Sequence, residues 1–257
     1  MNLVRLVGVI WWLNLKMRSR SAFDGFMNIL WPLFFSTTVF LMFRSTGAAG
    51  GALLSAAVGA SVMGVWSSTS TTASSMLQQE RRQGTLELVV AAPAPFGLVL
   101  LPITLSMATI GLYSMVVTIL WGRFAFGIDI AVRDPWGFAA AVAVTVVAIG
   151  VLGFLLAVTS VRYRTAWALG STLELPVWLI GGFLVPLAAL PDWVRPISWL
   201  LAPTWGMAAI RDAAEGRSPL VDAALCLALA AGYGLVGALL SRRLVHSARV
   251  HATLALS

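Results

Sequence analysis

The stretch WGFAAAVAVTVVAIGVLGFLLAVTSV, at residues 136–161, decides the fold class of this chain. It contains no charged residue, and about 20 consecutive apolar residues are enough for a helix to cross the hydrocarbon core of a bilayer. Of the 257 residues, 59% are hydrophobic and 11% are charged, and the mean hydropathy is +0.90. Soluble domains have about 25% charged residues. This composition excludes a soluble enzyme, a nucleic-acid-binding domain and a disordered chain, and it predicts an all-α polytopic membrane protein.

Other apolar runs flank this stretch, and together they predict a single transmembrane domain over residues 1–257 with six transmembrane helices. The predicted spans are 26–43, 52–76, 96–121, 136–161, 165–190 and 220–241. Gly181, Gly182 and Pro186 weaken the outer half of the fifth span, which suits either a hinge or a site of close helix packing.

An even number of spans places both termini on one side of the membrane. That side holds most of the basic residues, namely Arg5, Lys16, Arg18, Arg20, Arg81, Arg82, Arg162, Arg164, Arg242, Arg243 and Arg249. The other side holds Arg44, Arg123, Arg133, Arg195, Arg211 and Arg217. Because cytoplasmic loops carry the excess of Lys and Arg, we expect a multi-pass protein of the plasma (inner) membrane with both termini in the cytoplasm.

Residues 1–25 are too short and too interrupted to span. Basic residues follow the apolar part of this segment, whereas they precede it in a signal peptide. We interpret the segment as an amphipathic interfacial helix, with Trp11 and Trp12 at headgroup depth and Lys16, Arg18 and Arg20 facing the phosphates of membrane lipids. A frayed tail is the alternative.

Residue counts exclude several kinds of site. Cys226 is the only cysteine, and the two histidines, His246 and His251, lie near the end of the chain, so no metal site is expected. The only lysine, Lys16, is not in a Gly-Lys-Ser/Thr context, so the chain has no phosphate-binding loop of its own. No catalytic constellation and no nucleic-acid partner are expected.

The connection at residues 78–95 reads QQERRQGTLELVVAAPAP and is the longest predicted cytoplasmic loop. Thr85 is a suitable N-cap for a short helix that ends before Pro93. Exposed apolar and charged residues on such a helix, including Leu86 and Glu87, would form a docking surface for a soluble partner. A plain solvated turn is the alternative.

The segment 191–219 is too apolar for a solvated loop and too broken by prolines to span. It predicts two short external re-entrant or interfacial helices anchored by tryptophans. The prolines and tryptophans concerned are Pro191, Pro196, Pro203, Trp193, Trp199 and Trp205.

Two motifs carry a resemblance to a known family. The pattern Glu-Arg-x-x-Gly-Thr-Leu-Glu after the second span resembles that of the type-2 export permeases of ATP-binding-cassette transporters; here it is Glu80, Arg81, Gly84, Thr85, Leu86 and Glu87. A second motif before the last span is similar to that of the same family; here it is Leu190, Pro191, Trp193, Pro203, Ile210, Arg211 and Asp212. The resemblance covers nearly the whole chain.

The resemblance implies a permease that dimerises with a second copy or a homologous permease, each half engaging a separate ATPase subunit that binds ATP and Mg²⁺. No cofactor is expected in this chain. Loop 78–95 would contain the coupling helix, and the leading interfacial helix would brace it. The implied coupling residues are Glu80, Arg81, Arg82, Gly84, Thr85, Leu86 and Glu87. The implied external gate contains Pro191, Trp193, Pro203, Trp205, Arg211 and Asp212.

Polar residues inside the spans are candidates for the substrate pathway. Between Ser67 and Ser75 every residue except Ala73 carries a hydroxyl. Either Ser68, Thr72 and Ser75 line a polar cytoplasmic vestibule, or these small residues serve helix packing. Glu174 is an acid well inside the fifth span, where a charge costs about 2.5–3.5 kcal/mol on insertion scales. It could contact a cationic substrate or make structural hydrogen bonds within the bundle.

The resemblance to export permeases, together with the apolar spans, predicts an exporter permease. It would move a lipophilic or amphiphilic molecule, such as a drug-like compound or a lipid, out of the cytoplasm or inner leaflet. Alternating access would be driven by the ATPase, and efflux of antibiotics would give resistance. The alternatives are a proton-coupled secondary efflux transporter that uses Glu174, a polysaccharide exporter permease, and an intramembrane enzyme or assembly factor.

Overall fold

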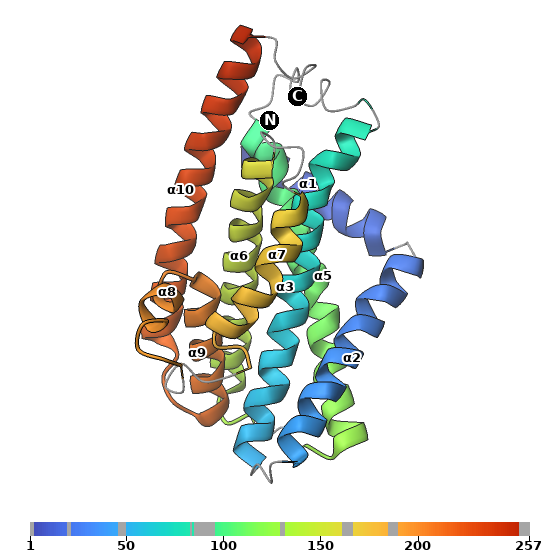
Figure 1. The fold of residues 1–257 in the computed structure, drawn as a ribbon, viewed down its shortest axis with the longest axis vertical. Coiled ribbons are helices and arrows are strands. Elements are labelled where there is room, and N and C mark those ends of the chain that lie inside the picture. Colours follow the sequence, from blue (N-terminus) through green and yellow to red (C-terminus); the bar gives the residue numbers. More distant parts are fainter. Residues whose placement is uncertain are drawn as a thin grey trace.

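A computed structural model describes residues 3–19, 22–45, 50–82, 84, 96–128, 132–160, 167–184 and 190–251. Within these residues all regular structure is helical (Figure 1). The helices are α1 (Leu3–Ser19), α2 (Ala22–Ser45), α3 (Gly50–Arg82), α5 (Phe96–Phe126), α6 (Pro135–Ser160), α7 (Trp167–Ile180), α8 (Arg195–Trp199), α9 (Ala202–Glu215) and α10 (Leu220–His251). The predicted all-α class is confirmed for this described part of the chain.

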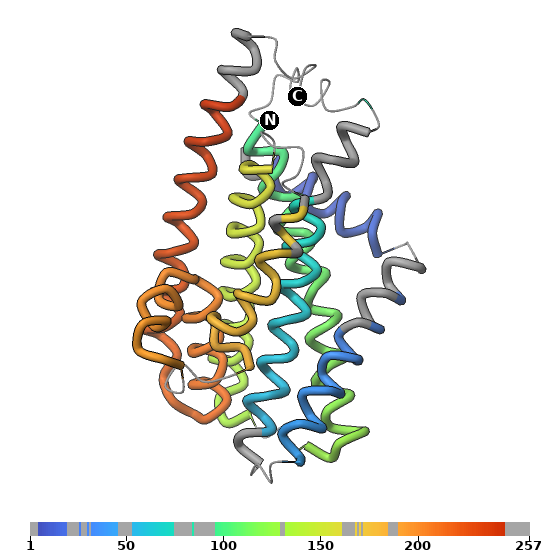
Figure 2. Tube along the Cα trace, in the orientation of Figure 1, coloured from blue at the N-terminus to red at the C-terminus, as the bar shows by residue number. Residues whose placement is uncertain are grey.

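The long helices α2, α3, α5, α6 and α10 lie along the long axis of the molecule, and α2, α3, α5 and α6 run in alternating directions (Figures 1 and 2). The start of α1, the end of α3, the start of α5 and the end of α10 lie at one end of this bundle. The short helices α8 and α9 lie in the opposite half. Helix α1 therefore begins at the same end of the bundle at which α10 ends, as an even number of crossings requires.

Three of the described helices are long and apolar enough to cross a membrane. They are α5, α6 and the Leu220–Leu244 part of α10. The prediction of a polytopic membrane protein agrees with them. The other predicted spans, 26–43, 52–76 and 165–190, fall on α2, on α3 and on α7 with the turn after it, and their crossing of the membrane stays a prediction.

Two boundaries differ from the sequence prediction. The fifth predicted span, 165–190, does not form one helix, because α7 ends at Ile180 and the chain turns through Gly181 and Gly182. Gly182 has a φ of +73°, a conformation in the left-handed region that glycine adopts readily. At the other end of the bundle, α3 continues to Arg82, so the predicted loop 78–95 begins as helix. Gln, Glu and Arg are good helix formers, which explains the extension.

The core lies where α3, α5, α6, α7 and α9 meet. Its largest buried side chains are Trp66, Trp178, Met115, Ile149, Phe183, Met207 and Ile210. Two buried hydroxyls beside it are satisfied within their own helices. Ser61 Oγ donates to the carbonyl of Ala57, and Thr145 Oγ1 donates to that of Ala141, each at 2.7 Å. The hydroxyls of Ser61 and Thr145 are therefore not left as unpaired donors in the core.

Small residues set the closest approaches between helices. A Cβ on Gly111 of α5 would lie 2.8 Å from the Cα of Val65 in α3. A Cβ on Gly206 of α9 would lie 2.4 Å from Thr145 Oγ1 in α6. Close backbone contact of this kind is how helices associate in a bilayer, where apolar burial alone drives association only weakly.

Helix α1 packs against α5 near the end of the bundle where the chain begins (Figure 1). Trp11 Nε1 donates to Thr109 Oγ1 at 3.2 Å, and Ile10 and Leu15 pack on a cluster around Met107. The predicted helix in residues 1–25 is thus present over Leu3–Ser19, and the alternative of a frayed tail is wrong for these residues. Its location in the membrane interface stays a prediction.

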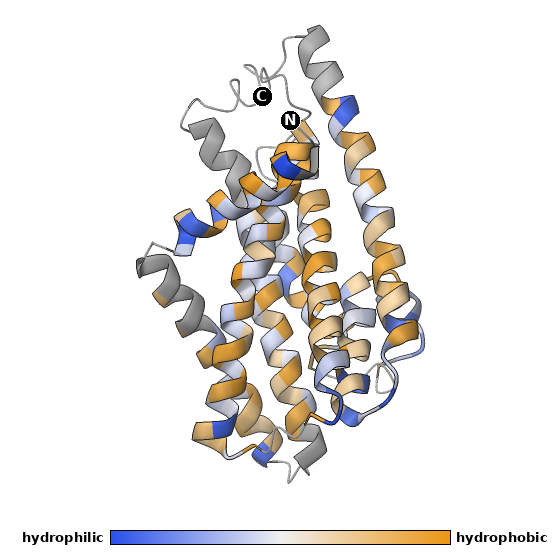
Figure 3. Cartoon of the chain, turned by 180° about the vertical axis from the view of Figure 1, so that it is seen from behind, coloured by the Kyte–Doolittle hydropathy of each residue, from blue (hydrophilic) through white to orange (hydrophobic). Residues whose placement is uncertain are grey.

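Most of the long helices are coloured as apolar, and strongly hydrophilic residues lie mainly near the helix ends and in the connections (Figure 3). On α10, Leu235 is 64% exposed, and Val236 and Leu239 are also exposed. On α2, Phe34 is 63% exposed. Such a surface is unfavourable in water and is typical of helices that face lipid or another apolar subunit.

Candidate functional site

A cavity of about 370 Å³ lies between α2, α3, α5 and α7. Small-molecule sites occupy roughly 300–1,000 Å³, so this cavity is large enough for a small ligand. Its described lining residues are Pro32, Phe35, Ala60, Met63, Gly64, Ser67, Ser68, Thr71, Ser114, Glu174 and Trp178. The walls are thus largely apolar and aromatic, with one group of hydroxyls and one carboxyl group.

Glu174 reaches this cavity from α7 and is hydrogen-bonded across it to α3. Ser67 Oγ donates to Glu174 Oε1. One turn earlier, a Cβ on Gly170 would lie 2.2 Å from Ser74 Oγ and 2.6 Å from the carbonyl of Ser70. Because glycine allows α7 to lie this close to α3, the carboxyl group of Glu174 reaches Ser67 directly. The sequence left open whether Glu174 contacts a cationic substrate or makes structural hydrogen bonds within the bundle. The structure shows a hydrogen bond of the second kind and places the side chain beside the cavity, and contact with a substrate stays a prediction.

Hydroxyls of the run on α3 donate to carbonyls of the same helix even where they line the cavity, as Ser68 Oγ does to Val65 at 3.1 Å and Thr71 Oγ1 does to Ser67 at 2.6 Å. Ser67, Ser68 and Thr71 line the cavity. Thr69 and Ser74 are buried, and they donate to the carbonyls of Val65 and Ser70, each at 2.8 Å. The interpretation as helix-packing residues agrees with Thr69 and Ser74, and the interpretation of the run as the lining of a cytoplasmic vestibule stays a prediction.

The structure describes the side chains of two residues of the predicted vestibule trio, Ser68 and Thr72. Ser68 is among the lining residues, whereas Thr72 is not among those that the structure describes there, and the side chain of Ser75 lies outside the described part. The cavity follows the face of Ala60, Gly64, Ser67 and Thr71 instead, because α7 packs along that face. The contribution of Ser67 and Thr71 was missed, since the sequence did not indicate which side of α3 meets α7.

An aromatic pair forms another wall of the cavity. The ring of Phe35 on α2 meets the ring of Trp178 on α7 edge to face, with 5.0 Å between centroids and an interplanar angle of 73°. Trp178 is only 5% exposed. Since Trp178 follows Glu174 by four residues, carboxyl and indole lie on the same face of α7.

At the far end of α7, the carbonyl of Phe183 is held between two other helices. Arg211 Nη2 on α9 donates to it at 3.2 Å. A Cβ on Gly59 of α3 would lie 1.8 Å from the same oxygen. Burial lowers the pKa of Arg211 to about 10, and the nearby charge of Glu215 opposes this shift. The guanidinium thus stays protonated at neutral pH and makes a charge-assisted bond to the turn.

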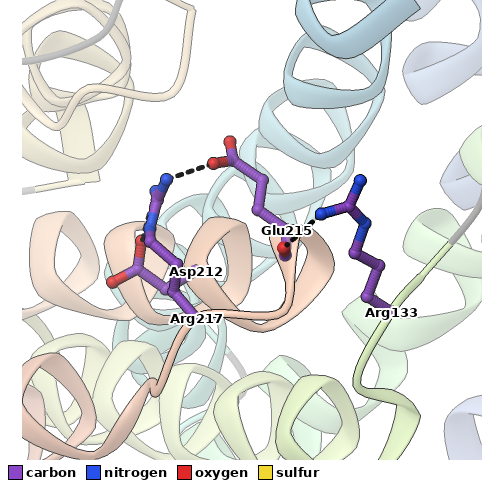
Figure 4. A network of polar contacts seen from close by, with 4 residues as sticks. All are labelled: Arg133, Asp212, Glu215 and Arg217. Atoms are coloured by element: carbon purple, nitrogen blue, oxygen red, sulfur yellow. Dashed lines mark hydrogen bonds and ion pairs between the residues drawn. The ribbon is translucent and has the colours of Figure 1, made fainter.

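The C-terminal end of α9 is tied to the segment before α6 (Figure 4). Arg217 Nε donates to Asp212 Oδ1 at 2.8 Å, and Arg217 also pairs with Glu215. The hydrogen bond and charge of Asp212 raise the pKa of Arg217. Arg133 Nη1 donates to the carbonyl of Glu215 at 3.4 Å. Asp212, predicted in the external gate, therefore belongs to an exposed polar cluster.

The remaining predicted gate residues lie on α9 and in the segment before α8. Pro203 is buried at the start of α9, and Trp205 Nε1 donates to the carbonyl of Trp199 at 2.9 Å. Pro191 and Trp193 lie exposed ahead of α8. Two short helices are present as predicted, and their re-entrant position in the membrane stays a prediction.

Tyr233 on α10 joins the two short helices at their junction. Its hydroxyl donates to the carbonyl of Leu200 and accepts from the backbone N–H of Ala202 at 3.2 Å. We expect Tyr233→Phe to lower the free energy of unfolding by about 1–3 kcal/mol, because both backbone groups lose a partner. Chemical denaturation of the detergent-solubilised protein measures this loss. Tyr113→Phe, at an exposed position on α5, should change stability by less than about 0.5 kcal/mol; equal effects of the two substitutions would contradict the prediction.

Those predicted coupling residues that the structure describes lie at the end of the bundle where the chain begins. Glu80, Arg81 and Arg82 are in the last turn of α3, and their side chains lie outside the described residues. Gly84 is exposed, has a φ of +69° and has no atom within 4 Å of a Cβ placed on it. Thr85, Leu86 and Glu87 lie outside the described residues.

Within the described part of the chain, no group of three His, Cys, Asp or Glu residues is placed to hold a metal ion.

The sequence model of the ABC-2 type transporter family matches residues 5–214. No curated protein matches the chain. The match extends from α1 to the last turn of α9 and includes every helix that lines the cavity. The chain therefore belongs to the ABC-2 type transporter family, as a type-2 permease of an ATP-binding-cassette transporter.

Proposed function

We propose that this permease exports a lipophilic or amphiphilic molecule from the cytoplasm or inner leaflet, powered by a separate ATPase subunit. The cavity between α2, α3, α5 and α7 carries this proposal. Its apolar and aromatic walls suit an apolar cargo body, and its hydroxyl and carboxyl groups suit one polar end. A strongly polar polymer would find few hydrogen-bonding partners on these walls.

Six crossings by α2, α3, α5, α6, α7 with its following turn, and α10 are the topology that we favour. The exposed apolar surfaces of these helices support it, as does the position of hydrophilic residues toward the helix ends (Figure 3). The end that holds the start of α1 and the end of α10 would face the cytoplasm of a cell with this protein in its plasma (inner) membrane. Helix α1 would lie in the inner interface, where exposed Trp12 and Lys16 would meet lipid.

A second permease, either another copy or a homologue, would cover the open side of the cavity. Phe34 on α2 is 63% exposed and Leu175 on α7 is 61% exposed, and both helices line the cavity. Paired faces of this kind would bury apolar surface against each other and enclose the cargo. Transport would then follow alternating access, with the pathway between the two permeases opening inward and outward in turn.

The ATPase would act through the last turn of α3 and the connection between α3 and α5, which together include the predicted coupling residues. It would bind ATP and Mg²⁺, and this chain would bind neither.

At the external end, the link from Arg211 to the Phe183 carbonyl would join α9 to α7, so that movement of α7 would move the gate formed by α8 and α9.

ATP-driven uptake into inside-out proteoliposomes tests this function. The permease would be reconstituted with its ATPase and offered tetraphenylphosphonium, a neutral lipophilic dye and a labelled oligosaccharide. We expect uptake of at least one amphiphile, which an ATPase variant without its phosphate-loop lysine abolishes. Uptake of the oligosaccharide alone would identify a polysaccharide exporter. Uptake driven by a pH gradient without ATP would identify a proton-coupled transporter.

A further inference from the structure

We propose that Glu174 makes the cavity selective for amphiphilic cations, with its carboxylate as the group that recognises the positive charge. This inference rests on the proposed transport function and specifies the class of cargo. It starts from the charge balance of the cavity, because among the described lining residues Glu174 is acidic and none is basic.

The carboxylate has no fixed countercharge in the described structure. Ion pairs described elsewhere in the molecule join Arg195 to Asp192 and Arg217 to Asp212 and Glu215, in the half that holds α8 and α9. Glu174 instead accepts a hydrogen bond from the hydroxyl of Ser67. A carboxylate in apolar surroundings is stabilised by a neighbouring cation, so a positively charged ligand in the cavity would supply the countercharge that the described residues do not supply.

The surroundings of Glu174 suit a cation with an apolar body. The indole of Trp178 lies one helical turn further along the same face of α7, and the ring of Phe35 packs edge to face against it. Aromatic faces attract cations and also bury apolar groups. Carboxylate and aromatic rings therefore border one space, in which a charged centre and its hydrophobic substituents can be held together.

A purely structural role for Glu174 does not require its negative charge. The bond from Ser67 uses one acceptor position of a carboxylate that offers about four. The carbonyl oxygen of a glutamine could accept the same hydrogen bond. Glu174→Gln therefore removes the charge while keeping the shape and the bond to α3, which separates cation recognition from helix packing.

Binding of tetraphenylphosphonium measures this charge recognition. The probe has no N–H or O–H group, so it responds to charge and aromatic contact alone. We would measure its affinity for the permease–ATPase complex in lipid nanodiscs by equilibrium dialysis, with empty nanodiscs subtracted and tetraphenylborate as the anion of matching shape. We expect the wild-type complex to prefer the cation, and Glu174→Gln to reduce the ratio of cation to anion affinity about tenfold or more.

Two variants control the experiment. Glu174→Asp keeps the charge and should keep the cation preference. Asp192→Asn removes an acid that is 92% exposed and remote from the cavity lining, and it should leave the affinity ratio unchanged. An unchanged ratio in Glu174→Gln would overturn the inference. Should that variant fail to fold, a wild-type complex without any preference for the cation would overturn it equally.

Failure of this inference differs from failure of the proposed function. If proteoliposomes with the wild-type complex take up cationic and neutral amphiphiles equally well with ATP, the transport function stands and charge selection by Glu174 is wrong. If it takes up no amphiphile of any charge, the proposed function itself is wrong.

Discussion

Gly59→Ala is expected to destabilise this permease by about 3 kcal/mol or more. The added Cβ would lie 1.8 Å from the carbonyl oxygen of Phe183 and 2.9 Å from its carbonyl carbon. These are backbone atoms, so no side-chain rotation relieves the overlap. The turn after α7 must move, and its carbonyl would then lose the bond from Arg211. Thermal unfolding of the purified protein in detergent, followed by tryptophan fluorescence, measures the loss.

Gly232→Ala is the matched control for this experiment. Gly232 lies in α10, and a Cβ placed there has no atom within 4 Å. Because alanine also favours the helix by roughly 0.5–1 kcal/mol over glycine, this variant should unfold at the same temperature or higher. Equal melting temperatures for Gly59→Ala and wild type would show that α3 and the turn after α7 are not in the contact described.

Helix positions were largely predictable from the sequence because a lipid-facing helix must be apolar along its whole length. The predicted starts at Phe96 and Leu220 coincide with the starts of α5 and α10. The end of α7 was not predictable in the same way. Hydropathy continues through Gly181 and Gly182, but the chain turns there, and this turn depends on contacts with α3 and α9 that hydropathy does not contain.

The candidate site was predictable only where a residue was unusual for its surroundings. Glu174 was identified because an acid within an apolar run is costly. Its partner Ser67 was not singled out, because it is one of many hydroxyl residues in a run that covers all faces of α3. Gly170 determines which of these hydroxyl residues bonds Glu174, because its close approach to Ser70 and Ser74 fixes which face of α3 meets α7. That contact joins residues far apart in sequence and leaves no local signal.

Gly84→Val is expected to uncouple the permease from its ATPase. At a φ of +69° an L-residue is strained by about 1–2 kcal/mol, and a β-branched side chain is among the least tolerant of this conformation. Gly84 is exposed and has open space around it, so the substitution creates no clash within this chain. If the connection between α3 and α5 contacts the ATPase in this conformation, affinity for the ATPase should fall roughly 5- to 30-fold. Co-purification and transport-coupled ATP hydrolysis measure the loss.

Gly127→Val separates coupling from backbone strain. Gly127 has a φ of +65°, is exposed and also has open space around it. It follows the end of α5, whereas Gly84 follows the end of α3, and these two helix ends lie at opposite ends of the bundle (Figure 1). The two substitutions therefore impose the same strain at the two ends of the molecule. Only the end that meets the ATPase should respond with lost association, so equal loss in both variants, or none in Gly84→Val, would mean that the α3–α5 connection is not the contact through which ATP hydrolysis drives transport.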